Sequence, residues 1–340
     1  MLKYSYPLVS VIIPSFNNEE KIKNALQSVS AQDYENIEII FVNDASTDKT
    51  LSNAEKFLKN SKRGFKIINH EKNLGVSAAR NSGIEASQGE YILFCDGDDM
   101  MKKNLVSELA GLIKKYDCEI SFGGITEHFE NGGADREIPI DLKISQPLNG
   151  EQAAYMRIFT KGFMPHICCT MFRKNFLEKI NLRFTEGCTN AEDTEFQTKA
   201  FCRAEKVSFT RECLYIYFNA GSKKDSIEKN MKIFRSCLEA DSRTAEYLIE
   251  HLKSKKIKFL VKNSYLPELA VKRLTGCAKF NEPQKYFELL KNPEFKKILR
   301  SSFKTFFFKP EVCLKAFAVL FMPKLYFKIR KTSPPYDKIH

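Results

Sequence analysis

Three aspartates that lie close together carry the clearest chemistry in this sequence of 340 residues. Asp96, Asp98 and Asp99 follow shortly after an apolar run at residues 91–94. Carboxylates this close repel one another unless a cation or hydrogen-bond donors offset their charge. Mg²⁺ and Mn²⁺ bind one or two carboxylates together with the oxygens of a diphosphate. We therefore expect a divalent metal site here, and the alternative is a solvated turn that caps the next helix.

A fourth aspartate, Asp44, follows a second apolar run at residues 37–42. The hydroxyl residues after it, Ser46 and Thr47, can cap the next helix, but capping does not account for Asn43 and Asp44 themselves. A carboxylate held at the end of a buried strand can accept the imide N–H of a uracil or thymine ring. Asp44 is thus a candidate for reading a nucleotide base.

Arg80 is the candidate for contacting a phosphate. It lies one turn into a helix that is predicted to begin after Gly75. Its guanidinium can therefore reach an anion at the edge of the sheet where the aspartates gather. The alternative is an ordinary surface arginine on an amphipathic helix.

The elements that must position these residues alternate between strand and helix through the first 125 residues. Strands are predicted at residues 8–13, 37–42, 65–68, 91–94 and 119–122, and helices at residues 22–29, 48–58, 76–86 and 102–116. Short, uncharged strands separated by helices indicate an α/β fold with a mostly parallel sheet sandwiched by helices. Ligands bind at the carboxyl ends of such strands. Polar clusters follow four of the predicted strands, at residues 15–17, 43–48, 69–71 and 96–99.

Composition and charge indicate a folded protein with two parts. The chain is 43% hydrophobic and 28% charged and holds few glycines and prolines, which excludes disordered and collagen-like classes. At about 150 residues per domain, the length suggests two domains. Residues 1–222 carry a net charge of −3 and residues 223–340 a net charge of +15. We expect a catalytic domain over residues 1–222 and a basic helical domain over residues 223–340.

The ten cysteines are scattered and form no Cys-x-x-Cys pair. This spacing predicts reduced, mostly buried cysteines rather than disulfides or a zinc site. The apolar stretch before Pro14 is too short for a signal peptide, and no stretch is long enough for a membrane span. The sequence therefore predicts a cytoplasmic protein.

The last 45 residues combine positive charge with phenylalanine. Residues 296–340 hold 11 Lys plus Arg against 2 acidic residues, interleaved with seven phenylalanines between Phe303 and Phe327. This mixture is typical of amphipathic segments on an anionic membrane surface. The phenylalanines can equally pack the core of the helical domain beneath a solvated basic face. RNA binding is a third reading, but no recognition motif is present, and we expect no nucleic-acid partner.

Taken in order, these motifs resemble the family 2 glycosyltransferases of GT-A fold. The resemblance rests on residues 9–17, on Asn43-Asp44-Ala45-Ser46-Thr47-Asp48, on residues 73–83 and on Asp96-Gly97-Asp98-Asp99. It continues through Phe184 and Gly187 into residues 191–196, which are similar to the Glu-Asp motif that supplies the catalytic base of the family. It covers about residues 7–222.

The resemblance implies a role for each matching residue. The nucleotide pocket would be lined by Pro14, Ser15 and Asn17, and Asp44 would read the nucleotide base. Arg80 would lie near the diphosphate, Asp96 would approach the ribose, and Asp98 with Asp99 would bind the metal. Asp193 would be the catalytic base, and Glu192 would position Asp193 or contact the acceptor. Without the resemblance, Glu192 and Asp193 read as first-turn acids that stabilise a helix.

The chain departs from the family pattern at three places. Where this chain has Asn43 and Ala45, the family usually has Asp and Gly. Many relatives have an arginine where this chain has Asn219, and the nearest cations here are Lys223 and Lys224. These lysines can replace it as phosphate contacts, and the alternative is that they are solvated lysines at a domain junction.

The implied reaction is metal-dependent transfer of a sugar, with inversion, from a nucleoside-diphosphate sugar to a hydroxyl group. The expected cofactor is Mn²⁺ or Mg²⁺ and the expected donor a UDP-sugar. The acceptor would be a glycan or lipid-linked glycan in cell-surface polysaccharide or lipopolysaccharide synthesis, with the enzyme peripheral on the inner face of the cell membrane. The alternatives are a nucleotidyltransferase, which would release pyrophosphate, and a non-catalytic nucleotide- or RNA-binding protein.

Overall fold

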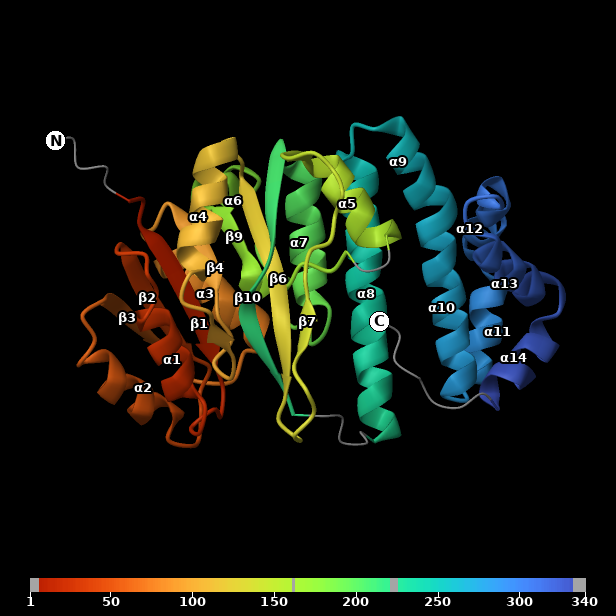
Figure 1. The fold of residues 1–340 in the computed structure, drawn as a ribbon. Helices are drawn as coiled ribbons and strands as arrows, with labels where there is room; N and C mark the ends of the chain where they lie inside the picture. Colours follow the sequence, from red (N-terminus) through yellow and green to blue (C-terminus); the bar gives the residue numbers. More distant parts are fainter. Residues whose placement is uncertain (1–5, 161–162, 221–225, 333–340) are drawn as a thin grey trace. The chain divides into compact units, whose positions relative to one another are not determined.

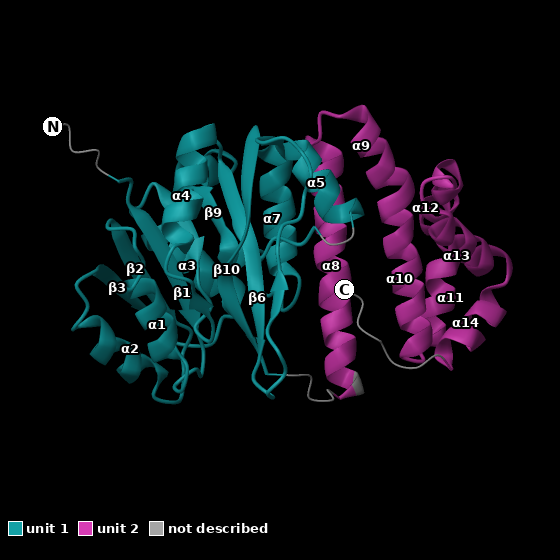
Figure 2. Cartoon of the chain, viewed as in Figure 1, with its two compact units in different colours: residues 1–223 teal, residues 224–340 magenta. Residues whose placement is uncertain are grey.

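The computed structural model describes residues 6–160, 163–220 and 226–332. The chain forms two compact units, residues 1–223 and 224–340 (Figures 1 and 2). None of the helices in the described part of the chain is long and apolar enough to cross a membrane. None of the ten cysteines, all of which lie in the described residues, forms a disulfide, and nine of them are buried, as the sequence predicts.

Unit 1 is built on one sheet, and the predicted α/β class is confirmed. Its strands lie in the order β3-β2-β1-β4-β9-β6-β10-β5. They are β1 (Val9–Ser15), β2 (Ile37–Asn43), β3 (Gly64–Asn69), β4 (Tyr91–Phe94), β5 (Met100–Met101), β6 (Ile120–Phe129), β9 (Thr170–Arg173) and β10 (Lys206–Asn219), with β7 (Arg136–Ile138) on β6 and β8 (Leu148–Asn149) on β10. The neighbours β3, β2, β1 and β4 pair in parallel, and so do β6 and β10.

Helices that alternate with the strands along the chain cover this sheet (Figure 1). They are α1 (Ile22–Ser30), α2 (Thr50–Leu58), α3 (Val76–Ala86), α4 (Leu105–Tyr116), α5 (Gly150–Phe159), α6 (Lys174–Lys179) and α7 (Glu192–Arg203). The helical spacing predicted α1 to α4 because their inward residues recur every three or four positions. In α1, Ile22, Leu26 and Val29 are fully buried against the sheet.

Two features of the sheet differ from a simple alternation of strands and helices. β9 inserts between β4 and β6 and runs antiparallel to both. β10 extends over 14 residues. Its register with β6 shifts between Phe209 and Cys213, so the residues between these two positions are not regularly paired with β6. The polar interruption at Arg211 and Glu212 breaks the alternating pattern that predicts a strand, which is why the sequence did not reveal β10.

Unit 2 is entirely helical over its described residues. It contains α8 (Ile227–His251), α9 (Lys255–Leu260), η2 (Val261–Tyr265), α10 (Leu266–Lys279), α11 (Pro283–Lys291), α12 (Pro293–Ser301), η3 (Ser302–Thr305), α13 (Pro310–Phe321) and α14 (Pro323–Lys331). Its core gathers apolar residues of five of these helices, among them Leu274, Tyr286, Leu299, Val319 and Tyr326. Proline at the first position of α11 to α14 helps to start each helix.

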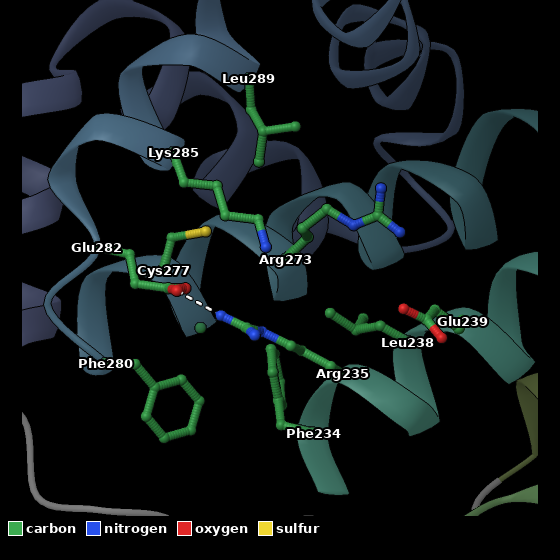
Figure 3. Close-up of a pocket in the computed structure, with 11 residues that line it drawn as sticks. Phe234, Arg235, Leu238, Glu239, Arg273, Cys277, Phe280, Glu282, Lys285 and Leu289 are labelled. Carbon is green, nitrogen blue, oxygen red and sulfur yellow. Dashed lines mark hydrogen bonds and ion pairs between the residues drawn. The ribbon is translucent and has the colours of Figure 1, made fainter. Parts of the chain in front are cut away.

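A cavity of about 220 Å³ lies within unit 2 between α8, α10 and α11 (Figure 3). Arg235 donates to the Glu282 carboxylate across it. Phe234 and Phe280 form one of its apolar walls, with their rings 5.8 Å apart. All of its lining residues belong to unit 2, so this cavity is separate from the polar clusters of unit 1.

Candidate active site

The polar clusters of unit 1 meet at the carboxyl ends of β1, β2 and β4. Ser15 and Asn43 are opposite one another in the register of β1 and β2. The amide of Asp44 donates to the carbonyl oxygen of Ser15 at 2.9 Å, and a Cβ added at Gly97 would lie 2.6 Å from the Ser15 hydroxyl. Glycine at position 97 therefore lets the aspartate turn approach the end of β1.

Asn17 ties the loops after β1 and β2 together. Its backbone amide donates to the Ser46 hydroxyl at 3.1 Å, and its side-chain oxygen accepts from the amide of Thr47 at 2.9 Å. The expectation that Ser46 or Thr47 caps the next helix is therefore wrong. The α2 helix begins two residues after Asp48, whose carboxylate accepts from the amide of Thr50.

The Asp44 carboxylate is almost fully buried, with 3% of the residue exposed. It accepts from the amides of Leu74 and Gly75 at 2.9 and 2.8 Å and from the imidazole of His70 at 2.7 Å. His70 in turn contacts the Ser82 hydroxyl at 3.0 Å. Because a carboxylate offers about four acceptor positions, these three donors leave one position of Asp44 for a ligand.

The backbone at this edge adopts the left-handed conformation at several non-glycine residues. The φ angles of Asn17, Ala45 and Ala191 are 52°, 59° and 64°. For a residue with a Cβ this conformation costs about 1–2 kcal/mol. The left-handed φ of Ala45 gives a physical reason for the glycine that the family usually has at this position.

We expect Ala45→Gly to raise the free energy of unfolding by about 0.5–1 kcal/mol, because relief of strain exceeds the entropy that glycine adds to the unfolded chain. Urea denaturation measures the change. The matched control is Ala86→Gly at the end of α3, where the backbone is helical, and it should lower stability by about the same amount. A destabilised Ala45→Gly protein would contradict the proposed strain.

The three aspartates after β4 have different surroundings. Asp98 is exposed, Asp96 is partly exposed and Asp99 is buried. The Asp99 carboxylate accepts from the Tyr215 hydroxyl and from the amide of Phe218, each at 2.9 Å. Burial, with the charges of Asp96 and Asp98, raises the pKa of Asp99 to about 8. Asp99 therefore anchors the turn to β10.

Asp98 is the carboxylate of this turn that is available to a ligand. Partial burial and the charge of Asp96 raise its pKa, so a cation at this position would relieve the repulsion. Within the described residues no three His, Cys, Asp or Glu side chains are grouped to hold a metal by themselves. The carboxylate of Asp98 nevertheless fits Mg²⁺ or Mn²⁺, which need few protein ligands when a diphosphate supplies the others. Asp99, the second metal ligand expected from the sequence, has both of its oxygens bonded to β10 instead.

Arg80 is buried, with 3% of the residue exposed, so the alternative of a surface arginine is wrong. Its two terminal nitrogens donate to Asp96 at 3.0 Å and to Glu192 at 3.1 Å. Its guanidinium also lies 5.3 Å from the centre of the Phe184 ring. Arg80 thereby joins the aspartate turn to the start of α7, although these segments are far apart in the sequence.

The two carboxylates that share Arg80 respond differently. Burial alone would raise the pKa of Asp96, but the charges of Arg80 and His166 outweigh it and hold that pKa below its usual value. The pKa of Glu192 is raised, because burial and the adjacent charge of Asp193 exceed the effect of Arg80. The charge of Arg80 thus outweighs burial at Asp96 but not at Glu192.

We expect Arg80→Gln to lower the free energy of unfolding by about 3 kcal/mol, because it removes a buried cation, 4% exposed, from two carboxylates that are only 28% and 13% exposed. The loss should shrink below about pH 4. The depressed pKa of Asp96 contributes stability above its unfolded value of 3.8, and this contribution disappears as Asp96 becomes protonated.

Arg173→Gln is the matched control for Arg80→Gln, and both are measured by urea denaturation. Arg173 also joins two carboxylates, Glu90 and Asp117, but these are 48% and 84% exposed. Such surface pairs contribute about 0–1 kcal/mol. Equal losses in the two variants would show that burial does not strengthen the Arg80 contacts.

The α7 helix begins with the acidic pair Glu192 and Asp193. Ala191 stands before it in the left-handed conformation and provides no side-chain cap. One oxygen of Asp193 accepts from the amide of Thr194 at 2.6 Å. The charge of Asp193 acts on both Arg80 and His166, which places it at the same site as the aspartate turn.

His166 and Tyr215 belong to this site but could not be singled out from the sequence. Tyr215 bridges two of the aspartates, since its hydroxyl accepts from the amide of Asp96 and donates to Asp99. The His166 ring stacks on Tyr215 at 5.5 Å, and its Nδ1 accepts from the amide of Cys168 at 3.3 Å. Burial lowers the pKa of His166 despite the nearby charges of Asp96 and Asp193.

Asn219 is the last residue of β10. Its side-chain amide donates to Glu127 at 2.6 Å. Lys223 and Lys224, which the sequence offers as substitute phosphate contacts, lie outside the described residues.

Three comparisons with known proteins give a consistent picture. The family described as Glycosyl transferase family 2 matches residues 10–181. The uncharacterized glycosyltransferase EpsJ of Bacillus subtilis is 34% identical over 217 residues, which are 62% of this chain and 61% of EpsJ. The chain therefore spans less than two thirds of the length of this relative.

Solved structures show the same fold. Residues 1–349 of Staphylococcus aureus TarS, in complex with UDP-GlcNAc, align with a TM-score of 0.66 at 20% identity, over 95% of this chain and 88% of that chain. The mannosyltransferase PcManGT from Pyrobaculum calidifontis, in complex with GDP-Man and Mn²⁺, aligns with a TM-score of 0.57 at 14% identity, over 96% and 88% of the two chains. At these identities the likeness establishes the fold alone.

Proposed function

The chain belongs to glycosyltransferase family 2, as its sequence predicts, and on this premise we propose that it transfers a sugar from a nucleoside-diphosphate sugar to a hydroxyl group with inversion. The observation that carries the proposal is the position of Arg80, which donates to Asp96 at the end of β4 and to Glu192 at the start of α7. A donor-binding turn and an acidic pair that can serve the acceptor are thereby held at one site.

The donor end of the site consists of the loops after β1, β2 and β4. We assign the nucleotide pocket to Pro14, Ser15 and Asn17, the base contact to the remaining acceptor position of Asp44, and the ribose contact to Asp96. Because both terminal nitrogens of Arg80 are engaged by carboxylates, Arg80 orders this end of the site beside the diphosphate. A UDP-sugar is the favoured donor, in keeping with the UDP-GlcNAc complex of TarS.

Asp98 is the residue that we assign to the metal, because it is the exposed carboxylate of the turn. The hydrogen bonds that Asp99 accepts from Tyr215 and Phe218 hold the turn that carries Asp98. A bound Mn²⁺ or Mg²⁺ would offset the negative charge that develops on the leaving diphosphate. Support for a divalent ion comes also from the Mn²⁺ complex of PcManGT, a protein of the same fold.

Asp193 is proposed as the general base. It accepts the proton of the acceptor hydroxyl while that oxygen attacks the anomeric carbon from the face opposite the diphosphate, so a single displacement inverts the configuration. Glu192, the first residue of α7, is fixed by Arg80 and so holds the start of the helix in place. Asp193 is thereby oriented toward the acceptor.

The acceptor is proposed to be a glycan or a lipid-linked glycan of cell-surface polysaccharide synthesis. TarS, named a poly(ribitol-phosphate) beta-N-acetylglucosaminyltransferase, is 29% identical over 61% of this chain and 35% of its own length, and it supports an acceptor of this class. A position in the cytoplasm, peripheral on the inner face of the cell membrane, is part of the same proposal.

Release of nucleoside diphosphate from UDP-, GDP- and dTDP-sugars, measured with Mn²⁺ or Mg²⁺, tests the proposal. We expect one donor to be consumed, with slow hydrolysis even without acceptor. Release of pyrophosphate instead would identify a nucleotidyltransferase. If no donor is consumed and none binds, the transferase proposal falls, and a non-catalytic nucleotide- or RNA-binding protein takes its place.

A further inference from the structure

Exposed apolar side chains are concentrated in one short part of unit 2. Of the eighteen large hydrophobic residues that are exposed in the described chain, ten lie between residues 303 and 329. They are Phe303, Phe306, Phe307, Phe308, Leu314, Phe317, Phe321, Met322, Leu325 and Ile329. Scattered exposed apolar residues are normal, but such a concentration in one segment indicates an interaction surface.

The α13 helix is apolar on both of its faces. Val312, Ala316 and Val319 point into the core of unit 2 and are at most 4% exposed. Leu314, Phe317 and Phe321 recur on the opposite side at helical spacing and are 62%, 46% and 66% exposed. Core packing therefore accounts for one face of α13 and leaves the other without a partner in the described chain.

The segments on either side of α13 continue this pattern. In α14, Tyr326 is buried, whereas Leu325 and Ile329 are 51% and 54% exposed. Between η3 and α13, Phe307 is fully exposed, and its ring lies 5.7 Å from that of Phe306. The sequence left open whether these phenylalanines pack the core or face outward, and the structure places most of them outward.

Positive charge surrounds the exposed apolar residues. Lys304, Lys315, Lys324, Lys328 and Lys331 are exposed in the same segment. Glu311 is the one acidic residue between positions 303 and 331. The surface therefore combines apolar bulk with an excess of cations, which disfavours contact with a second copy of itself, because like charges would face one another.

We propose that residues 303–331 form a lipid-binding surface that holds the enzyme on an anionic phospholipid bilayer. Helices of this kind lie in the plane of the bilayer interface, with apolar side chains inserted by about 5–10 Å and lysines among the head groups. Four of the ten exposed residues have no aromatic face for stacking on bases and the chain has no nucleic-acid recognition motif, which favours lipid over nucleic acid. The inference deepens the proposed position at the membrane but does not depend on the transfer reaction.

Sedimentation of the full-length protein with large vesicles tests the proposal. One set of vesicles contains phosphatidylcholine alone, and the other also contains phosphatidylglycerol. We expect at least about tenfold tighter binding to the anionic vesicles, because each lysine near such a surface contributes about 1 kcal/mol. This preference should weaken in 1 M salt, where the screening length falls to about 3 Å.

Two variants separate the apolar from the charged contribution. Phe307→Ser with Phe321→Ser should weaken binding at least about tenfold, because it removes apolar side chains that would enter the interface. The matched control is Phe65→Ser with Ile144→Ser in unit 1, where the side chains are 40% and 44% exposed. Lys324→Glu with Lys328→Glu should remove the preference for anionic lipid, and Lys59→Glu with Lys62→Glu should retain it.

Three outcomes would overturn the proposal. They are absence of binding to anionic vesicles, equal loss in the unit 1 control variants, and a dimer in ultracentrifugation that Phe307→Ser with Phe321→Ser dissociates while vesicles remain unbound. Turnover of a soluble nucleotide sugar by the same samples keeps the two proposals distinct. If turnover persists without lipid binding, the lipid surface fails alone, and if vesicles bind without turnover, the transferase function fails alone.

Discussion

Asp193→Asn is expected to lower the rate of sugar transfer by about 10²- to 10⁴-fold, because it removes the group that accepts the proton of the acceptor hydroxyl. The variant should still bind the donor. Asparagine keeps the side-chain oxygen that accepts from the amide of Thr194, so the start of α7 should stay in place. The rate constant at saturating acceptor and the dissociation constant of the donor measure the two effects separately.

Glu151→Gln is the control for this substitution. Glu151 is also an acidic residue in the first turn of a helix, α5, and its replacement should leave the transfer rate within about twofold of the original, as expected for a residue away from the site. If Asp193→Asn retains full activity while Glu192→Gln loses it, the base is Glu192, and Asp193 contributes only to the stability of α7.

Asp98→Ala is expected to reduce metal-dependent turnover by about 10³-fold or more, because the metal contributes several kcal/mol to departure of the diphosphate. The loss should not come from unfolding. Partial burial and the charge of Asp96 raise the pKa of Asp98, so its charge does not stabilise the fold at neutral pH, and its removal should leave the melting temperature unchanged or higher. Turnover titrated with Mn²⁺ and a thermal melt measure both quantities.

Asp33→Ala, a substitution of another exposed aspartate in unit 1, serves as the control and should keep both turnover and its dependence on Mn²⁺. The metal assignment would be contradicted if the unsubstituted protein kept its turnover after a chelator had removed all divalent metal. Asp99→Asn gives a further comparison. This substitution should affect turnover only indirectly, because Asp99 is hydrogen-bonded to Tyr215 and Phe218 and acts on the ligand through the position of the turn.

The sequence predicts the first half of unit 1 well because its information is local. Continuous apolar runs and helical spacing give β1 to β4 and α1 to α4, and the polar residues after the strands follow from the parallel pairing. The positions of Asn17, Asp44 and Asp98 at the carboxyl ends of the strands are predicted in this way. The start of α7 at Glu192 also follows from acidic residues that favour a helix N-terminus.

What the sequence leaves open depends on contacts between distant segments. Asp98 and Asp99 look equivalent in the sequence, and they differ only because Tyr215 of β10 lies beside Asp99, 116 positions away. His166 follows from no pattern, since its place at the site depends on the pairing of β9 with β4. In α13 both faces are apolar, so periodicity alone does not tell which of them faces the core.

The insertion of β9 between β4 and β6 also bears on how the protein is made. β4 ends at Phe94 and its neighbour β9 begins at Thr170, so the ribosome must add about 76 residues before this edge of the sheet can close. At about 5–20 residues per second, this takes roughly 4–15 s. During that time the nascent chain exposes the open edge of a buried strand, which is prone to pair with other chains. Synthesis of this protein thus passes through a stage at which chaperone protection of β4 has the most to contribute.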